Sequence, residues 1–289
     1  MSMDAICAYY GITRQAHYQM LRREASRERE ALLILELVRQ IRRKHPRMGG
    51  RKLLVKLEPM LAAERLGIGR DRLFAWLRQA DLLVKRRKAH RRTTFSGWWR
   101  TPNLLPGLTV TRPNQVWVSD ITYLETEDPP FVYLFLLMDL YSRYLLGWHV
   151  SASLAAEGAR CALQMALQVS QAPGTGCIHH SDHGVQYTST GYLASLTDHG
   201  ILPSMGEVGN CYDNVFAERV IGTLKGEYRL EDRLTDLFQA QQLSQEAVCL
   251  YNTDRPHLAL DYAVPRDVYF GQISTPFPLI IPAQKEVVT

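Results

Sequence analysis

The chain has 289 residues, enough for roughly two domains, and its 46% hydrophobic content is typical of a folded globular protein. No apolar run of about 18 residues predicts a membrane span, and no charged-then-apolar leader predicts secretion. Five scattered cysteines without a CxxC pair fit reduced cytoplasmic thiols and argue against a disulfide framework or a cysteine-based zinc site.

The two halves of the chain differ in charge. Residues 1–105 hold 24 Lys and Arg against 9 Asp and Glu, a net charge of +15, whereas the rest hold 10 against 20, a net charge of −10. Together they give the overall charge of +5. The basic part suits binding to a polyanion such as nucleic acid, and the acidic part suits binding of cations.

Small helical units open the chain. Residues 4–24 predict a helix, a turn at Gly11, and a second helix that Thr13 caps and that ends at two arginines. This is the size of a helix-turn-helix, although a plain helical hairpin explains the segment equally well. Residues 26–45 predict a longer helix. Its expected buried stripe consists of Ile34, Leu37 or Val38, and Ile41.

A second basic unit covers residues 51–83. An amphipathic helix, a turn around Gly67–Gly69 and another helix repeat the pattern, which favours helix-turn-helix units over plain hairpins. The candidate DNA contacts that point outward from this unit are Arg70, Arg72 and Arg78. A basic stretch without periodicity follows and predicts a linker along a phosphate backbone. Its candidate contacts are Lys85, Arg86, Arg87, Lys88, Arg91 and Arg92.

From Asn114 onward the pattern changes to strands. The predicted elements are strands at 115–124, 131–142 and 144–153, a helix at about 154–170, and a strand leading to Asp182. The second strand is too continuously apolar for a surface position and should be central. These elements together predict a mixed sheet flanked by helices. Asp120 on the first strand would lie beside Asp182 if the first and fourth strands are neighbours, which the sequence leaves open.

A third acid, Glu218, lies on a predicted helix. Thirty-five residues separate Asp182 from Glu218, which is room for a helix, a short strand, a loop and the start of that second helix. Its apolar stripe is Phe216, Val220, Leu224 and Tyr228, while Glu218, Gly222 and Lys225 share another face. Carboxylates from separate elements suit Mg²⁺. The alternative is that Asp182 is a turn residue and Glu218 a solvated charge.

Several stretches together carry a resemblance. WVSDITYL, LMDLYSRYLLGWHV, HHSDHGVQYTS and YNTDRPHLALDYAVPRDVY resemble the DDE transposases of bacterial insertion sequences, of the OrfB type with a retroviral-integrase-like core. The resemblance is dense over 112–270 and looser over the basic helices. It implies an α/β fold, with a ribonuclease H-like mixed five-stranded sheet flanked by helices and preceded by all-α helix-turn-helix-like units. The expected divisions are a helix-turn-helix-like unit with its connecting helix (1–45), a second such unit (46–84), a basic linker (85–111), an integrase-like catalytic core (112–270) and a C-terminal tail (271–289).

The same resemblance implies an activity and a site. Asp120, Asp182 and Glu218 are expected to bind two Mg²⁺ ions, which Mn²⁺ can replace, with Asp120 bridging them. Lys225 would approach the DNA end, while His183 and Asn214 would orient either the scissile DNA or a water molecule next to the metal site. The implied reaction is recognition of terminal inverted repeats, strand cleavage, and attack of the freed 3′-hydroxyl on another phosphodiester.

The implied partners are double-stranded DNA at the element ends and the target, other copies of the chain on DNA, and an OrfA-type product of an upstream frame, separate or fused. No membrane is expected, and the location would be the bacterial cytoplasm at the nucleoid. Two other functions are a DNA-binding regulator from an inactive element and a non-specific ribonuclease H-like nuclease. Intact acids argue against the first, and the basic helices argue against the second.

Three smaller interpretations complete the analysis. The histidines around Asp182 suggest a zinc site, but no His–Glu helix pair completes one. Asp139 is expected to cap the turn before Ser142. Arg255 either anchors the end of the chain onto the core or contacts DNA.

Overall fold

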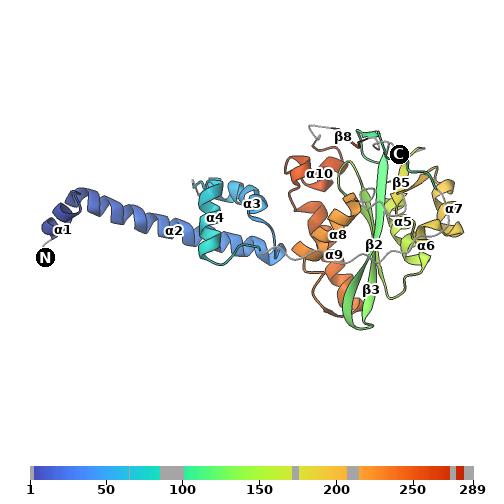
Figure 1. Cartoon of the computed structure of the whole chain (residues 1–289), viewed down its shortest axis with the longest axis horizontal. Coiled ribbons are helices and arrows are strands. Elements are labelled where there is room, and N and C mark those ends of the chain that lie inside the picture. The colour runs from blue at the N-terminus through green and yellow to red at the C-terminus, as the bar shows by residue number, and fades with distance from the viewer. Residues whose placement is uncertain are drawn as a thin grey trace, which may run out of the picture. The chain divides into compact units, whose positions relative to one another are not determined.

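The computed structural model describes residues 3–64, 66–84, 101–170, 176–206, 215–273 and 278–282. The chain divides into two compact units, an N-terminal unit Met1–Lys85 and a C-terminal unit Arg86–Thr289 (Figure 1). Each is described by itself. In the described parts, no helix combines the length and apolar character needed to cross a membrane.

The N-terminal unit is helical. Its helices are α1 (Met3–Tyr9), α2 (Arg14–Lys44), α3 (Gly50–Ala63) and α4 (Arg70–Gln79). The Thr13 hydroxyl accepts a hydrogen bond from the amide of Ala16 at 3.1 Å, so the predicted cap is confirmed. The predicted break between two helices near residue 25 is wrong, because α2 is continuous over 31 residues. No Gly or Pro lies there to end the helix.

Leucine and isoleucine side chains form the core of this unit. Ile34, Val38 and Ile41 of α2 are buried, which confirms the predicted stripe and selects Val38 over Leu37. They pack with the buried leucines of α3 and α4, which are Leu53, Leu57, Leu61, Leu73 and Leu77. The part of α2 before Ile34 has no buried residue.

The C-terminal unit is built on a mixed sheet. Its central path joins strands in the order β4 (Leu145–Ser151), β3 (Phe131–Asp139), β2 (Val116–Asp128), β5 (Ile178–Ser181) and β6 (Leu202–Met205). β2, β3 and β4 pair antiparallel, whereas β5 is parallel to β2 and β6 is parallel to β5. The predicted mixed sheet is therefore confirmed, and β7, which pairs with β2, adds a sixth strand to the five predicted. β3 is paired on both sides and nearly all its residues are buried, as its apolar run predicts.

Three short strands were not predicted. β7 (Leu234–Asp236) pairs in parallel with the end of β2. β1 (Thr109–Val110) and β8 (Leu279–Ile280) form a separate antiparallel pair, from stretches expected to be linker and tail. Strands of two or three residues carry no readable alternation, so only pairing reveals them. The five predicted domain limits stay a prediction.

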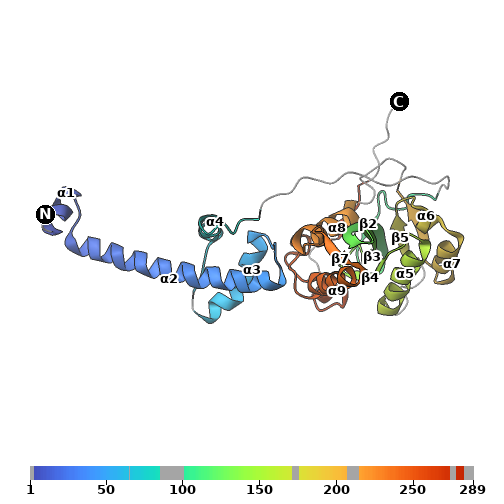
Figure 2. The same cartoon turned by 90° about the horizontal axis from the view of Figure 1, so that it is seen from below.

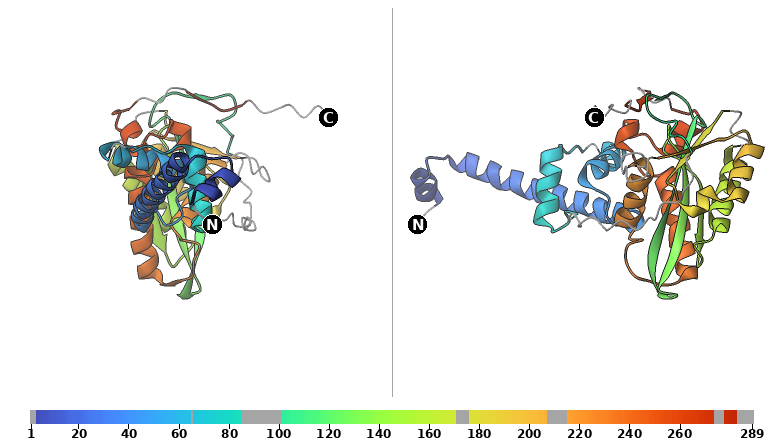
Figure 3. Two further views of the ribbon diagram at one scale, coloured as in Figure 1. Left: turned by 90° about the vertical axis from the view of Figure 1, so that its left-hand side faces the viewer. Right: turned by 45° about the vertical axis from the view of Figure 1, so that its right-hand side comes forward.

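Helices cover both faces of the sheet (Figures 1 and 2). The helices of this unit are α5 (Ala156–Ser170), α6 (Val185–Thr188), α7 (Thr190–Asp198), α8 (Val215–Glu227), α9 (Leu237–Thr253), η1 (Leu258–Leu260) and α10 (Pro265–Tyr269). α8 and α9 lie on one side, and α5, α6 and α7 lie on the other. Figure 3 shows the same layers, with orange helices on one side of the green strands and yellow-green helices on the other.

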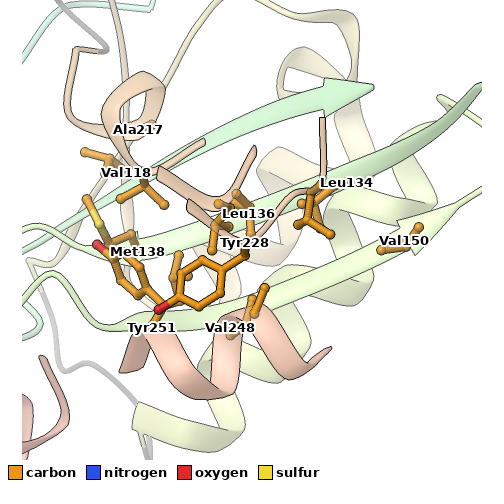
Figure 4. Packing of buried hydrophobic residues seen from close by; sticks show 14 of the residues in the cluster. Val118, Leu134, Leu136, Met138, Val150, Ala217, Tyr228, Val248 and Tyr251 are labelled. Atoms are coloured by element: carbon orange, nitrogen blue, oxygen red, sulfur yellow. The ribbon is translucent and has the colours of Figure 1, made fainter. Parts of the chain in front are cut away.

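Each face of the sheet has its own core. On the α8–α9 side, Val118 and Met138 of the sheet pack with Tyr228 and Tyr251 (Figure 4). On the other side, Trp117 and neighbouring residues pack with α5 and α7. Successive residues of β2 thus point to opposite faces, as its alternation predicts.

Gly147 of β4 allows helix α5 to approach the sheet closely. A Cβ atom at this position would overlap the backbone carbonyl of Ala162. The overlapping atoms belong to the helix backbone and cannot rotate away. Any side chain at residue 147 would therefore push α5 off the strand.

Candidate active site

The pairing of β2 with β5 brings two of the predicted acids together. In the parallel register, Trp117 lies opposite His179 and Val118 lies opposite His180. Continuing this register by two residues sets Asp120 beside Asp182, on the same face of the sheet. The adjacency that the sequence left open is therefore present, at the carboxyl end of β5.

Asp120 is half-buried and surrounded by negative charge. Its Oδ1 accepts a hydrogen bond from the amide of Ile121 at 2.8 Å. Burial raises the pKa of Asp120 to about 8, with help from the charge of Asp182 and, more weakly, that of Glu218. The Ile121 amide and Lys225 act in the opposite direction and lower this pKa. All four charged groups therefore interact at one centre, and a bound cation there would relieve the repulsion.

Asp182 is held by the turn that follows β5. Its Oδ1 accepts a hydrogen bond from the amide of Gly184 at 3.0 Å. Burial raises the pKa of the Asp182 carboxyl, whereas the Gly184 amide and the neighbouring His183 lower it. A Cβ on Gly184 would lie 3.0 Å from that same oxygen and equally close to Gln186. The glycine thus leaves room for the carboxylate in its present rotamer.

Glu218 is exposed in the first turn of α8. Ala217, Val220 and Leu224 are buried against the sheet, so most of the predicted apolar stripe is confirmed. Phe216 is only half-buried, and the guanidinium of Arg143 lies 4.8 Å from its ring centre. Glu218 therefore stays exposed, and its charge acts on Asp120.

Lys225 lies two turns further along α8. It is half-buried, and its Nζ lies 4.6 Å from the ring centre of Tyr123 on β2. Burial lowers the pKa of Lys225, while Glu125, Glu231 and Asp120 raise it. The predicted spacing after Glu218 therefore brings a cation to the acidic centre.

The donor chemistry of the three acids fits Mg²⁺, which takes oxygen ligands and is often held by only one or two carboxylates with several waters. Within the described ranges, no three His, Cys, Asp or Glu side chains are gathered into a single ion site. Asp120 and Asp182 would therefore form the nearer pair, with Glu218 facing them from the helix.

The zinc interpretation finds no support. The Nε2 of His179 lies 2.9 Å from the hydroxyl of Tyr192, and the Nδ1 of His180 lies 2.9 Å from the hydroxyl of Ser204. Both histidines are buried, and burial lowers the pKa of His179 to about 3. These rings therefore form part of the hydrogen-bonded core beneath the acids.

Asp139, at the end of β3, has a structural role. Its carboxylate accepts hydrogen bonds from the amides of Ser142, at 2.7 Å, and Asn114, at 2.8 Å. Burial raises its pKa to about 6, against these hydrogen bonds. The predicted turn cap is confirmed.

Arg255 is also structural. It is buried, and its guanidinium donates two hydrogen bonds to Glu227, at 2.7 and 2.9 Å. Its Nη1 lies 2.8 Å from Nε2 of His257. The interpretation that Arg255 anchors the chain end onto the core is confirmed, and the guanidinium is too buried to meet DNA in this conformation.

The remaining predicted DNA contacts divide into two groups. His183 is half-buried beside Asp182, and Arg70, Arg72 and Arg78 are exposed on α4. Arg70 pairs with Asp71 and Arg72 with Glu30, at 2.8 and 3.4 Å. Outside the described residues lie Asn214, Lys85, Arg86, Arg87, Lys88, Arg91 and Arg92. The DNA role of both groups stays a prediction.

Sequence reasoning missed two aromatic residues near the acids. Tyr123 contacts Lys225, and the hydroxyl of Tyr187 lies 3.0 Å from that of Ser119, next to Asp120. Tyr123 falls within the strand motif that carries Asp120, so its position was visible but its partner on α8 was not.

The strand order β4-β3-β2-β5-β6, with helices on both faces of the sheet, is that of the ribonuclease H-like fold. Two families, both described as Integrase core domain, match residues 110–211 and 199–265. Together they cover more than half of the chain.

Relatives agree with this class. The chain is 34% identical over 263 residues to the insertion element IS600 uncharacterized 31 kDa protein of Shigella sonnei, covering 88% of this chain and 94% of that one. It is 36% identical over 169 residues to the transposase for insertion sequence element IS904 of Lactococcus lactis, covering 57% and 66%. Transposase InsF for insertion sequence IS3A of Escherichia coli is 44% identical over 115 residues, covering 40% and 39%.

Among solved structures, the HTLV-2 integrase catalytic core domain in complex with magnesium aligns with a TM-score of 0.42 at 15% identity, covering 58% of this chain and 99% of that one. The family rests on the core-domain matches and the relatives. The chain belongs to the DDE transposases of insertion sequences with an integrase core domain, as its motifs predict.

Proposed function

We propose that this transposase recognises the terminal inverted repeats of its insertion sequence and catalyses divalent-metal-dependent DNA cleavage and strand transfer at Asp120, Asp182 and Glu218. The observation that carries the proposal is the register of β2 and β5, which sets Asp120 beside Asp182. The charge of Glu218 also acts on Asp120, which supports Glu218 as the proposed third acid.

The three acids would hold Mg²⁺, or Mn²⁺ in its place. A bound pair of such ions activates the attacking oxygen and stabilises the leaving oxygen in phosphoryl transfer. Asp120, whose carboxylate interacts with those of both Asp182 and Glu218, would hold the ions together with them. The amide of Gly184 keeps the Asp182 carboxylate oriented, and Lys225 supplies a positive charge for the phosphate of the DNA end.

The N-terminal unit would bind the double-stranded element ends. Its excess of Lys and Arg favours phosphate contacts, which make affinity fall with salt. Exposed arginines on α4 are available for this role. The target DNA would meet the C-terminal unit, with other copies of the chain on the same DNA and an OrfA-type upstream product as partners. This activity belongs at the nucleoid in the bacterial cytoplasm.

A strand-transfer assay with pre-cleaved element ends and Mg²⁺ tests the proposal. We expect the parent chain to join the ends to a target duplex. Asp182→Asn should lower joining by roughly 100-fold or more, because loss of a ligand costs more than loss of an outer partner, about 10- to 100-fold. Asp198→Asn, an exposed acid at the end of α7, is the matched control and should join normally.

The other outcomes are distinct. A regulator would shift the DNA without cutting it, and a simple nuclease would cut without joining. Joining by Asp182→Asn at the level of the Asp198→Asn control would refute the assigned site. Chelation of the divalent ion should abolish joining in the parent chain, and joining that persists would refute the metal requirement.

A further inference from the structure

We propose that Tyr123 is a positioning residue whose ring holds the Lys225 ammonium at the acidic centre, in the place from which it meets the DNA end. The inference rests on the proposed DNA contact of Lys225. Tyr123 lies three residues after Asp120 on β2, and Lys225 lies seven after Glu218 on α8. The contact therefore joins the two elements that carry these acids.

The ring is itself oriented. Phe131, which begins β3, meets it edge-on, with ring centres 5.5 Å apart and planes at 87°. The edge of one ring against the face of the other is a favourable aromatic arrangement. The contact with Phe131 thus orients the ring of Tyr123 independently of Lys225.

Lys225 needs such a guide because its stem is flexible and its charge is compact. Negative charge attracts the ammonium from different elements: Glu125 and Asp120 on β2, and Glu231 beyond the end of α8. A cation over an aromatic face is attracted by the ring quadrupole and is held in a defined direction. The ring thereby selects one position among those that the carboxylates would allow.

A purely structural role for Tyr123 makes a different prediction. Removing a half-buried ring from β2 would then affect stability and every function alike, with or without Lys225. If the ring acts through Lys225, the effect of removing it disappears once the lysine is gone. A double-mutant cycle separates the two.

The variants are Tyr123→Phe, Tyr123→Leu, Lys225→Met and the double variant Tyr123→Leu with Lys225→Met, all in the full chain. Tyr133→Leu is the matched control, because it removes a half-buried ring from the residue paired with Tyr123 on β3. The probe is a fluorescent duplex taken from the end of the element that encodes the chain, titrated at several salt concentrations.

We expect Tyr123→Leu to weaken binding of this duplex by about 3- to 10-fold, the range of a partly desolvated cation–π contact. Tyr123→Phe should bind like the parent chain because it keeps the ring. Lys225→Met should weaken binding and lower the salt slope by about one. In the Lys225→Met background, Tyr123→Leu should add no further loss.

A second readout does not depend on DNA. Reductive ¹³C-methylation of the lysines makes the Lys225 methyl signal visible by NMR, and Lys225→Met identifies it. We expect a ring-current shift in the parent chain and in Tyr123→Phe, absent in Tyr123→Leu and retained in Tyr133→Leu.

Three results would overturn the inference, and they are distinguishable. If Lys225→Met binds the duplex like the parent chain, the proposed DNA contact fails and this inference fails with it. If Tyr123→Leu weakens binding equally in both backgrounds, only the positioning role fails. A methyl signal that does not change in Tyr123→Leu refutes the ring contact itself.

Discussion

The buried pair of Arg255 and Glu227 allows a stability prediction with a worked magnitude. The Arg255 side chain is 6% exposed and that of Glu227 is 21% exposed. Arg255→Gln would leave the Glu227 carboxylate without its two hydrogen bonds at the end of α8. Breaking a buried pair costs about 3–5 kcal/mol, and because Glu227 keeps some solvent we expect the lower end, about 3 kcal/mol.

Thermal unfolding of the full chain measures this cost. For a unit of this size, about 3 kcal/mol corresponds to a fall in the melting temperature of roughly 6–12 °C. The control is Arg229→Gln, since the Arg229 side chain is 60% exposed in its pair with Asp232 and such pairs are worth about 0.2–1 kcal/mol. Binding of element-end DNA, measured below both transitions, should match that of the parent chain.

Two results would refute this reasoning. Equal stability of Arg255→Gln and Arg229→Gln would show that the pair contributes no more than a surface contact. Weakened DNA binding with unchanged unfolding would show that Arg255 contacts DNA, in contradiction to its burial.

Three further predictions concern glycines. Gly147→Ala should lower the free energy of unfolding by about 3 kcal/mol, because the added methyl overlaps the backbone of α5. Gly191→Ala, at an exposed position of α7, is the control and should be neutral or stabilising by up to about 1 kcal/mol. Equal losses of stability in chemical denaturation would contradict this prediction. Gly184→Ala should lower the rate of strand transfer by roughly 10-fold or more, because the added methyl crowds the Asp182 carboxylate. The melting temperature should change little. Strand transfer at the rate of the parent chain would show that the carboxylate has room for the methyl. Gly222→Ala should raise the free energy of unfolding by about 0.5–1 kcal/mol, since a glycine inside a helix is destabilising and nothing lies within 4 Å of the added methyl. A loss of stability in calorimetry would mean that other atoms cover this face of α8.

Much of the C-terminal unit was predictable because its signals are local. The four-residue spacing of Val220 and Leu224 predicted α8, and the alternation around Asp120 predicted β2. The short polar turn after Asp139 predicted its capping role. Each of these depends only on residues a few positions apart.

The errors arose where local signals are weak or absent. The two helices expected between Thr13 and residue 45 are one helix, since charged residues with good helix propensity continue through the expected break. β7 is too short to show alternation and exists because it pairs with the end of β2. A pattern within a few residues cannot identify a partner far away in the chain.

The amino-acid sequence by itself determined the kinds of element and the separation of charge, and it indicated three acids and the lysine that follows them as candidate site residues. It determined these because periodicity, charge and motif spacing are properties of neighbouring residues. Only the tertiary structure decided that β5 lies next to β2, that Lys225 rests on Tyr123, and that Arg255 is buried. Those facts depend on strand order and on how α8 and α9 pack on the sheet, which bring together residues that no local pattern connects.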